Sequence, residues 1–190
     1  MLTLEQLREQ LQSWKGCDLA ATANPVLGEG SPTARVMFIG EAPGQKEDEL
    51  KRPFVGAAGK FLDQLLSSIG YDRSSVYISN VVKYRPPENR EPTQEEKDQC
   101  MPWLMLEIAI IKPRVIVPLG RHSLGHFFPQ KTITDAHGKA FDLTPDLTIF
   151  PIYHPAAALH NGNLRSSLET DFRSLGSYLT SIGIHPVRAS

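Results

Sequence analysis

The chain of 190 residues has only two cysteines, Cys17 and Cys100. Two thiols so far apart in sequence cannot build a disulfide scaffold, and they indicate a reducing, intracellular setting. No apolar run approaches the roughly 18 residues of a membrane-spanning helix, and the N-terminus lacks the apolar core of a signal peptide. We therefore expect a cytoplasmic protein that does not enter a membrane.

An excess of charge of one sign is also lacking, because 20 Lys and Arg side chains stand against 21 Asp and Glu. A general positive charge is thereby excluded, and any nucleic-acid contact must come from a local patch. The sequence also lacks a phosphate-binding loop and a dinucleotide fingerprint, which argues against a nucleotide-binding protein. Ser123 follows His122, but no G-x-S-x-G elbow surrounds it, which argues against a serine hydrolase.

Short apolar runs alternate with amphipathic segments along the chain. Thr3 with Gln6, and Thr93 with Glu96, have the spacing of helix capping boxes. The patterns predict helices over 3–14, 57–70, 93–111 and 164–182, and strands over 35–40, 76–84, 114–120 and 147–155. This alternation predicts an α/β fold with a parallel sheet covered on both faces. We expect one domain over 1–190, with 183–190 as a flexible end.

The segments that follow the predicted strands contain most of the residues suited to chemistry. They read GEAPGQKED (40–48), NVVKYRPPENR (80–90), PLGRHS (118–123) and PIYHPAA (151–157). Ligands of open α/β sheets bind beyond the carboxyl ends of the strands, so the sequence predicts the functional pocket there.

Two residues at predicted strand ends are candidates for catalysis. Glu41 could orient or deprotonate a water molecule, although a Gly-Pro turn with an exposed glutamate is an equal alternative. His154 could donate a hydrogen bond to an anion that develops in the transition state, or it could cap a turn.

Two further residues are candidates for recognition of a base. Phe54 lies in a loop and could stack on a base, although an isolated phenylalanine more often belongs to the core. Asn80 interrupts an apolar strand, where its amide could pair with a pyrimidine edge or with neighbouring backbone. The nearby loop carries Lys83, Arg85 and Arg90 between prolines, which suits phosphate contacts or a solvated turn.

Several of these motifs together resemble the family 4 uracil-DNA glycosylases. The segments that carry the resemblance are GEAPGQKED (40–48), PFVGAAGKFLD (53–63), YISNVVKYRPPENREP (77–92), IVPLG (116–120) and YHPAAALH (153–160). The resemblance implies the uracil-DNA glycosylase fold, a three-layer α/β/α sandwich around a four-stranded parallel sheet. It also implies a DNA-repair enzyme that flips uracil out of DNA and hydrolyses its N-glycosidic bond, leaving an abasic site.

The resemblance assigns a role to each matching position. Glu41, Asn89 and His154 would be catalytic: Glu41 acts on the attacking water and His154 stabilises the departing uracil anion. Ala42, Pro43, Phe54 and Asn80 would form the uracil pocket, and Pro155, Ala156 and Ala157 belong to the segment that would enter the minor groove of DNA. To these we add Glu47, because the methyl group of thymine would clash near Pro43 or Glu47. We also expect the basic loop of Lys83, Arg85 and Arg90 to contact DNA.

The sequence departs from the family at its iron–sulfur cluster. The four cysteine positions of the family read Trp14, Cys17, Tyr84 and Cys100 here. A 4Fe–4S cluster needs four good ligands, mostly thiolates. We expect that the cluster is lost, that no cofactor replaces it, and that Trp14 and Tyr84 fill its volume.

Two alternatives remain at the level of the sequence. A related branch of the superfamily traps DNA covalently through a histidine in a basic insert, but that insert is missing here, so we expect turnover. Loss of the cluster could instead mark a catalytically silent domain that binds nucleic acid. In either case we expect a monomer that binds DNA with one face.

Overall fold

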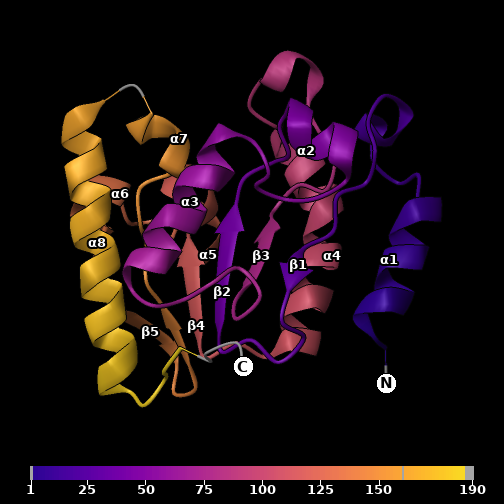
Figure 1. Ribbon diagram of the computed structural model, residues 1–190. Helices are drawn as coiled ribbons and strands as arrows, with labels where there is room; N and C mark the ends of the chain where they lie inside the picture. The colour runs from indigo at the N-terminus through magenta and orange to yellow at the C-terminus, as the bar shows by residue number, and fades with distance from the viewer. Residues whose placement is uncertain (1, 160, 187–190) are drawn as a thin grey trace.

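The structure, a computed structural model, describes residues 2–159 and 161–186 (Figure 1). The α-helices are α1 (Leu4–Ser13), α2 (Gln45–Leu50), α3 (Ala57–Ser68), α4 (Gln94–Ile111), α5 (Gly120–Phe127), α6 (Ile133–Ala136), α7 (Pro155–Ala158) and α8 (Gly162–Ser181). Two 3-10 turns, η1 (Asp18–Ala21) and η2 (Pro87–Asn89), lie in the connections. The strands are β1 (Glu29–Gly30), β2 (Val36–Gly40), β3 (Tyr77–Asn80), β4 (Val115–Pro118), β5 (Phe141–Thr144) and β6 (Leu147–Ile149).

The strands form one sheet in the order β1-β3-β2-β4-β6-β5. The four inner strands run parallel, as predicted, and β1 and β5 pair antiparallel at the two edges. The prediction of four strands is therefore wrong in number, although the α/β class is confirmed. β1 has only two residues, and β5 is a largely exposed edge strand of four residues outside the apolar runs from which the strands are predicted.

The side chains of β2 point alternately into two hydrophobic layers, one on each face of the sheet. Val36 and Phe38 face α3 and α8, whereas Met37 and Ile39 face α1 and α4. Successive side chains of a strand point to opposite faces, so a fully apolar strand is buried between two layers of helices. Figure 1 shows α8 and α3 on one side of the sheet and α4 and α1 on the other. The three-layer α/β/α sandwich is thus confirmed.

Two predicted strands end earlier than the sequence suggests. β3 ends at Asn80 rather than at Tyr84, although the Val81 and Val82 N–H groups still donate to the Gly40 and Glu41 carbonyls. β6 ends at Ile149, although the Phe150 and Ile152 N–H groups still donate to the Ile116 and Pro118 carbonyls, so Pro151 does not interrupt the contact with β4. Asn80 therefore lies at the end of a strand, and the interpretation that it interrupts one is wrong.

Both ends of the chain pack on the domain as far as they are described. The capping box of Thr3 and Gln6 is confirmed, and α1 buries Leu7 and Leu11. Ile184 is also buried, and its carbonyl accepts a hydrogen bond from the Tyr71 hydroxyl at 3.1 Å. The rest of the predicted flexible end, residues 187–190, lies outside the described residues. None of the described helices has both the length and the apolar character needed to cross a membrane.

Candidate active site

The loops at the carboxyl edge of the sheet surround a cavity of about 330 Å³. Its lining includes Glu41, Pro43, Asn89, His122 and His154. The cavity therefore brings together residues that follow β2, β3, β4 and β6. This is the edge at which the sequence predicts the pocket.

Glu41 lies directly after β2, close to the ammonium of Lys97 and the imidazole of His122. Its Oε1 atom is 3.5 Å from Lys97 Nζ of α4 and 3.4 Å from His122 Nδ1 of α5. Neither contact has the geometry of a hydrogen bond, and this buried oxygen has no hydrogen-bond partner among the described residues. The carboxylate is thus oriented into the cavity, where it can face a positively charged sugar or a water molecule. The sequence interpretation missed Lys97 and passed over His122, although His122 lies in one of the predicted strand-end segments.

Gly40, the last residue of β2, allows Phe54 and Asn80 to approach each other. A Cβ atom at Gly40 would collide with Asn80 Oδ1 and would lie 2.6 Å from Phe54 Cζ. Asn80 is only 2% exposed, yet its Oδ1 atom has no hydrogen-bond partner among the described residues. A buried amide oxygen without a partner is costly, so this atom is available for a donor from a ligand.

His154 reaches the same place from the end of β6. Its ring centroid lies 5.7 Å from that of Phe54. The Nδ1 atom accepts a hydrogen bond from the Ala156 N–H at 3.1 Å, which leaves the hydrogen of a neutral ring on Nε2. Burial lowers the pKa of His154 to about 4. The imidazole is therefore neutral at pH 7 and can act as a hydrogen-bond donor.

The other residues predicted for the uracil pocket lie around this group. Ala42 and Pro43 line the cavity. Glu47 of α2 is half-buried, and its Oε1 atom accepts the N–H groups of Val55 and Gly56 at 2.8 and 2.7 Å. The carboxylate of Glu47 thus binds the loop that carries Phe54.

The prediction that Lys83 contacts phosphate is wrong. Its side chain is completely buried, and its Nζ atom lies 2.5 Å from Glu107 Oε2 of α4. The same ammonium donates to Ser79 Oγ at 2.9 Å and to the Asn80 carbonyl. An ammonium with three protein partners and no exposed surface cannot reach DNA.

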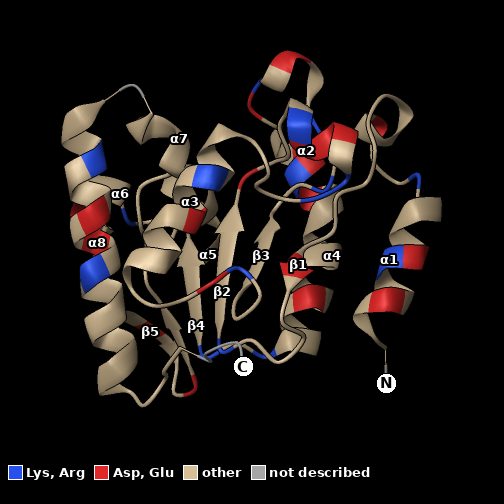
Figure 2. Ribbon diagram, viewed as in Figure 1, with Lys and Arg blue, Asp and Glu red and all other residues tan. Residues whose placement is uncertain are grey.

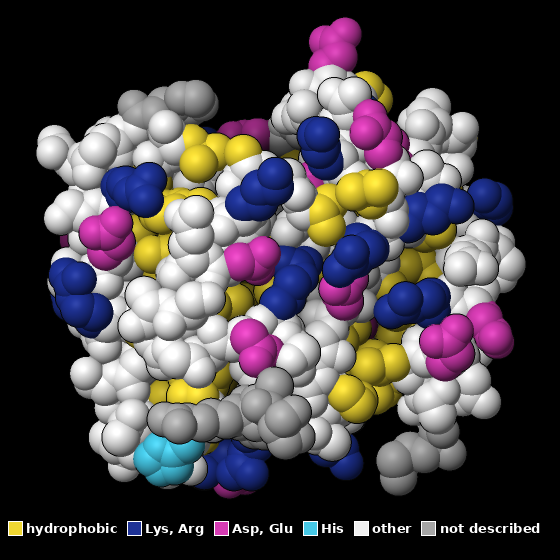
Figure 3. Space-filling model, viewed as in Figure 1, with side chains coloured by type: hydrophobic (Ala, Val, Ile, Leu, Met, Phe, Trp, Pro, Cys, Tyr) yellow, Lys and Arg dark blue, Asp and Glu magenta, His cyan; other side chains and the backbone are white. Residues whose placement is uncertain are grey.

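Arg85 and Arg90 lie closer to the surface, but each has a partner in the protein. Arg85 Nε donates to Asn89 Oδ1 at 2.7 Å. Arg90 binds both carboxylate oxygens of Glu96, at 2.9 and 2.6 Å, and so connects this loop to the start of α4. Figure 2 shows both signs of charge around α2, and Figure 3 shows basic and acidic side chains interspersed over the face in view. The described residues on the face in view therefore carry no continuous basic surface.

The segment after His154 forms the short helix α7. Pro155 is buried, whereas Ala156 and Ala157 are exposed beside the cavity. Leu159 follows them with 39% of its surface exposed. His160, the last residue of the predicted minor-groove segment, lies outside the described residues.

The four positions that correspond to cluster ligands lie together between α1 and α4. Cys17 and Cys100 are buried free thiols, and burial raises the pKa of both, that of Cys100 to about 12. The Tyr84 hydroxyl donates to the Trp14 carbonyl at 3.1 Å, and the two rings lie 5.9 Å apart. Trp103 packs against Trp14 with its ring 5.3 Å away. Two protonated thiols and a packed aromatic group do not fit a cluster that needs four thiolates.

Comparison with known proteins gives matches over most of the chain. A model of the uracil DNA glycosylase superfamily matches residues 27–174. A type-4 uracil-DNA glycosylase of Sulfurisphaera tokodaii is 47% identical over 185 residues, which cover 92% of this chain and 84% of the relative. The type-4 uracil-DNA glycosylase of Archaeoglobus fulgidus is 42% identical over 185 residues, 93% of each chain. A type-5 uracil-DNA glycosylase of Thermus thermophilus is 34% identical over 152 residues, 70% of this chain and 69% of the relative.

Proposed function

The chain belongs to the uracil-DNA glycosylase superfamily, as a member of the type-4 family, and we propose that it excises uracil from DNA. It hydrolyses the N-glycosidic bond, which leaves an abasic site and starts base excision repair. The observation that carries this proposal is the buried Asn80 amide, whose oxygen has no hydrogen-bond partner in the described part of the chain and lies beside Phe54 at the end of the sheet. Only a base that has left the DNA stack can reach such a site.

Asn80 selects uracil through the hydrogen-bonding pattern of its base edge. The Oδ1 atom accepts the N3–H of uracil, and the amide nitrogen donates to O4. Cytosine has an amino group in place of O4, so two donors would face each other, and a buried unpaired donor disfavours that base. Phe54 supplies the stacking surface.

His154 and Glu41 stabilise the two fragments that form when the bond breaks. Uracil departs as an anion, and the neutral His154 ring donates a hydrogen bond to it through Nε2. The sugar becomes cationic, and the Glu41 carboxylate stabilises it and orients the water molecule that attacks it. One water proton passes to the carboxylate, and the hydroxyl forms the new bond to the sugar carbon.

Ala156 and Ala157, with Arg85 and Arg90, contact the DNA on either side of the flipped base. The protein acts as a monomer on genomic DNA in the cytoplasm.

We expect the protein to release uracil from an oligonucleotide that carries a single uracil, and to leave cytosine and thymine in place. Glu41→Gln keeps the size of the side chain but removes its charge, so the single-turnover rate is expected to fall by about 10²-fold. Glu49→Gln of α2 is the matched control, because Glu49 is exposed and bonds only to Gln45 in the described chain. Retained DNA binding without any release by the wild-type protein would contradict the proposal and identify a silent binding domain.

The protein works without an iron–sulfur cluster. The aromatic packing of Trp14, Tyr84 and Trp103 supports this part of the proposal, because aromatic side chains stand at two of the four ligand positions and pack against one another. We expect iron and sulfide analysis of freshly purified protein to find fewer than about one iron per chain, against about four for a full cluster. The double variant Trp14→Cys/Tyr84→Cys restores four cysteines and serves as the positive control. About four irons in the wild-type protein would contradict the expectation.

A further inference from the structure

The loop Pro53–Gly56 holds the Phe54 ring in an unusual backbone conformation. Phe54 has a φ of +51°, in the left-handed region that residues with a large side chain rarely adopt. Such a conformation persists only where surrounding contacts impose it. The ring that results is 6% exposed and lies beside His154 and Asn80.

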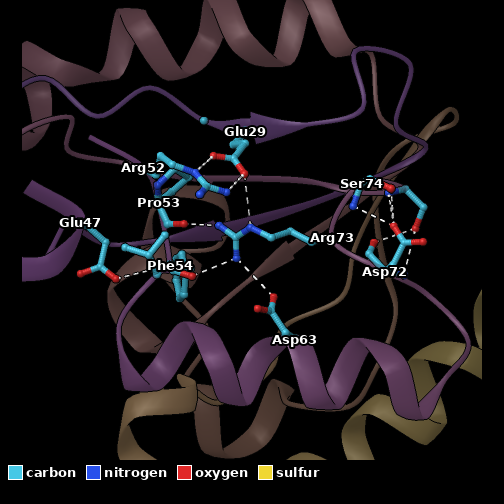
Figure 4. A network of polar contacts seen from close by, with 12 residues as sticks. Glu29, Glu47, Arg52, Pro53, Phe54, Asp63, Asp72, Arg73 and Ser74 are labelled. Atoms are coloured by element: carbon cyan, nitrogen blue, oxygen red, sulfur yellow. Dashed lines mark hydrogen bonds and ion pairs between the residues drawn. The ribbon is translucent and has the colours of Figure 1, made fainter. Parts of the chain in front are cut away.

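Arg73 binds the carbonyl side of this loop. Its guanidinium donates through Nη1 to the Phe54 carbonyl at 2.9 Å and through Nη2 to the Pro53 carbonyl (Figure 4). Two consecutive carbonyls are thus bound by one planar cation, an arrangement for which arginine is suited and lysine is not. Hydrogen bonds of this charged type are shorter and stronger than neutral ones.

Glu47 binds the amide side of the same loop. Its Oε1 atom accepts the next two N–H groups, those of Val55 and Gly56. The four consecutive residues are therefore held by a cation through their carbonyls and by an anion through their amides (Figure 4). The first turn of α3 packs directly against the loop. The approach is so close that a Cβ atom at Gly59 would collide with the Phe54 carbonyl.

Arg73 is itself fixed by two carboxylates from other elements. Its Nη1 atom lies 3.3 Å from Asp63 of α3, and its Nε atom lies 3.5 Å from Glu29 of β1. The side chain is 18% exposed, so the guanidinium has few positions open to it. Arg52 occupies the outer side of Glu29, with Nε and Nη2 each 2.6 Å from a carboxylate oxygen.

We propose that Arg73 is a positioning residue that, together with Glu47, holds Phe54 in the conformation that stacks on uracil. It touches no substrate and acts only through the Pro53 and Phe54 carbonyls. This inference rests on the proposed function for its catalytic consequence, but the effect on the loop exists in the free protein.

The first test is a double-mutant cycle on the excision rate. Arg73→Met removes both carbonyl contacts, and misplacement of the stacking ring is expected to slow single-turnover excision by about 10- to 100-fold. In a Phe54→Ala background the same substitution is expected to change the rate by less than about twofold, because the group through which Arg73 acts is gone. Equal effects of Arg73→Met in the two backgrounds would overturn the proposal, since a general loss of stability does not depend on the Phe54 ring.

Two further variants separate positioning from folding. Arg73→Lys keeps the charge beside Asp63 and Glu29 but can bind both carbonyls only from one atom, so an intermediate rate is expected. Arg52→Met removes an arginine of the same network that donates no side-chain hydrogen bond to the loop, and its rate is expected to match the wild type. A loss in Arg52→Met as large as in Arg73→Lys would overturn the proposal.

Amide hydrogen exchange of the free protein gives a readout that does not depend on catalysis. We expect faster exchange at Val55 and Gly56 in Arg73→Met and Arg73→Lys, and wild-type exchange in Arg52→Met. Unchanged exchange in both Arg73 variants would refute the positioning role even in an active enzyme. If instead the wild-type protein releases no uracil while these amides respond as expected, the proposed function fails and the inferred loop contact stands.

Discussion

Replacing His154 with alanine is expected to slow uracil excision by about 10²- to 10³-fold, the usual cost of removing one donor to a developing anion. The ring is neutral and carries its hydrogen on Nε2, because Nδ1 accepts the Ala156 N–H. The measurement is the single-turnover rate on an oligonucleotide with one uracil.

Two further substitutions of His154 distinguish its role as a hydrogen-bond donor through Nε2 from its role as the N-cap of α7. His154→Asn can still accept the Ala156 N–H and begin α7, but it places no donor at the position of Nε2. We expect it to be as slow as His154→Ala. His154→Gln carries an amide N–H farther along the side chain and is expected to recover part of the rate. A wild-type rate in His154→Asn would contradict the assigned role.

The low pKa of His154 also makes the free energy of unfolding depend on pH. The folded-state pKa of about 4 lies below the value of 6.5 for an unperturbed histidine, because burial disfavours the imidazolium. Between these two values the unfolded chain binds more protons at this position, so the free energy of unfolding falls as the pH is lowered through this window. Denaturant titrations across the window should show a weaker fall in His154→Asn. An equal fall in both proteins would contradict the assignment.

Replacing Lys83 with methionine is expected to destabilise the protein by about 3–5 kcal/mol, the cost of leaving a buried charge without its partner. Glu107 is completely buried and would retain only neutral donors: the Gly28 N–H at 2.7 Å, the Tyr77 hydroxyl at 3.0 Å and the Ser79 hydroxyl at 2.8 Å. Burial, together with this carboxylate, already raises the pKa of Tyr77. Equilibrium unfolding in urea measures the change, and an unaltered m-value would show that the two-state description holds.

A second substitution tests whether the uncompensated charge causes this loss. Glu107→Gln keeps a carbonyl oxygen for Gly28 and Tyr77 but removes the negative charge. The double variant Lys83→Met/Glu107→Gln is therefore expected to be more stable than Lys83→Met alone, which is the non-additivity of a coupled pair. If the two single losses simply add, the ion pair is not the source of the stability.

Much of the fold follows from local patterns in the sequence. Thr3 and Thr93 begin helices because each caps its own first turn, and the apolar runs of β2 and β4 predict buried strands. Glu41 lies at the predicted edge because it follows β2 directly, and His154 lies there because it is in the short connection between β6 and α7. A parallel sheet brings the carboxyl ends of its strands to one edge whatever the details of packing.

The tertiary structure decided the role of residues whose partners are distant in sequence. Lys83 resembles Arg85 and Arg90 in the printed sequence, and only Glu107, 24 residues away, makes it a buried structural charge. Lys97 and His122 come to Glu41 from two other elements. The conformation of Phe54 depends on Arg73, which is 19 residues away in the chain. The sequence by itself determined the class of fold and the edge that carries the site, because these depend on local periodicity and strand direction. The charge environment of each side chain depends on contacts between elements, which no local pattern specifies.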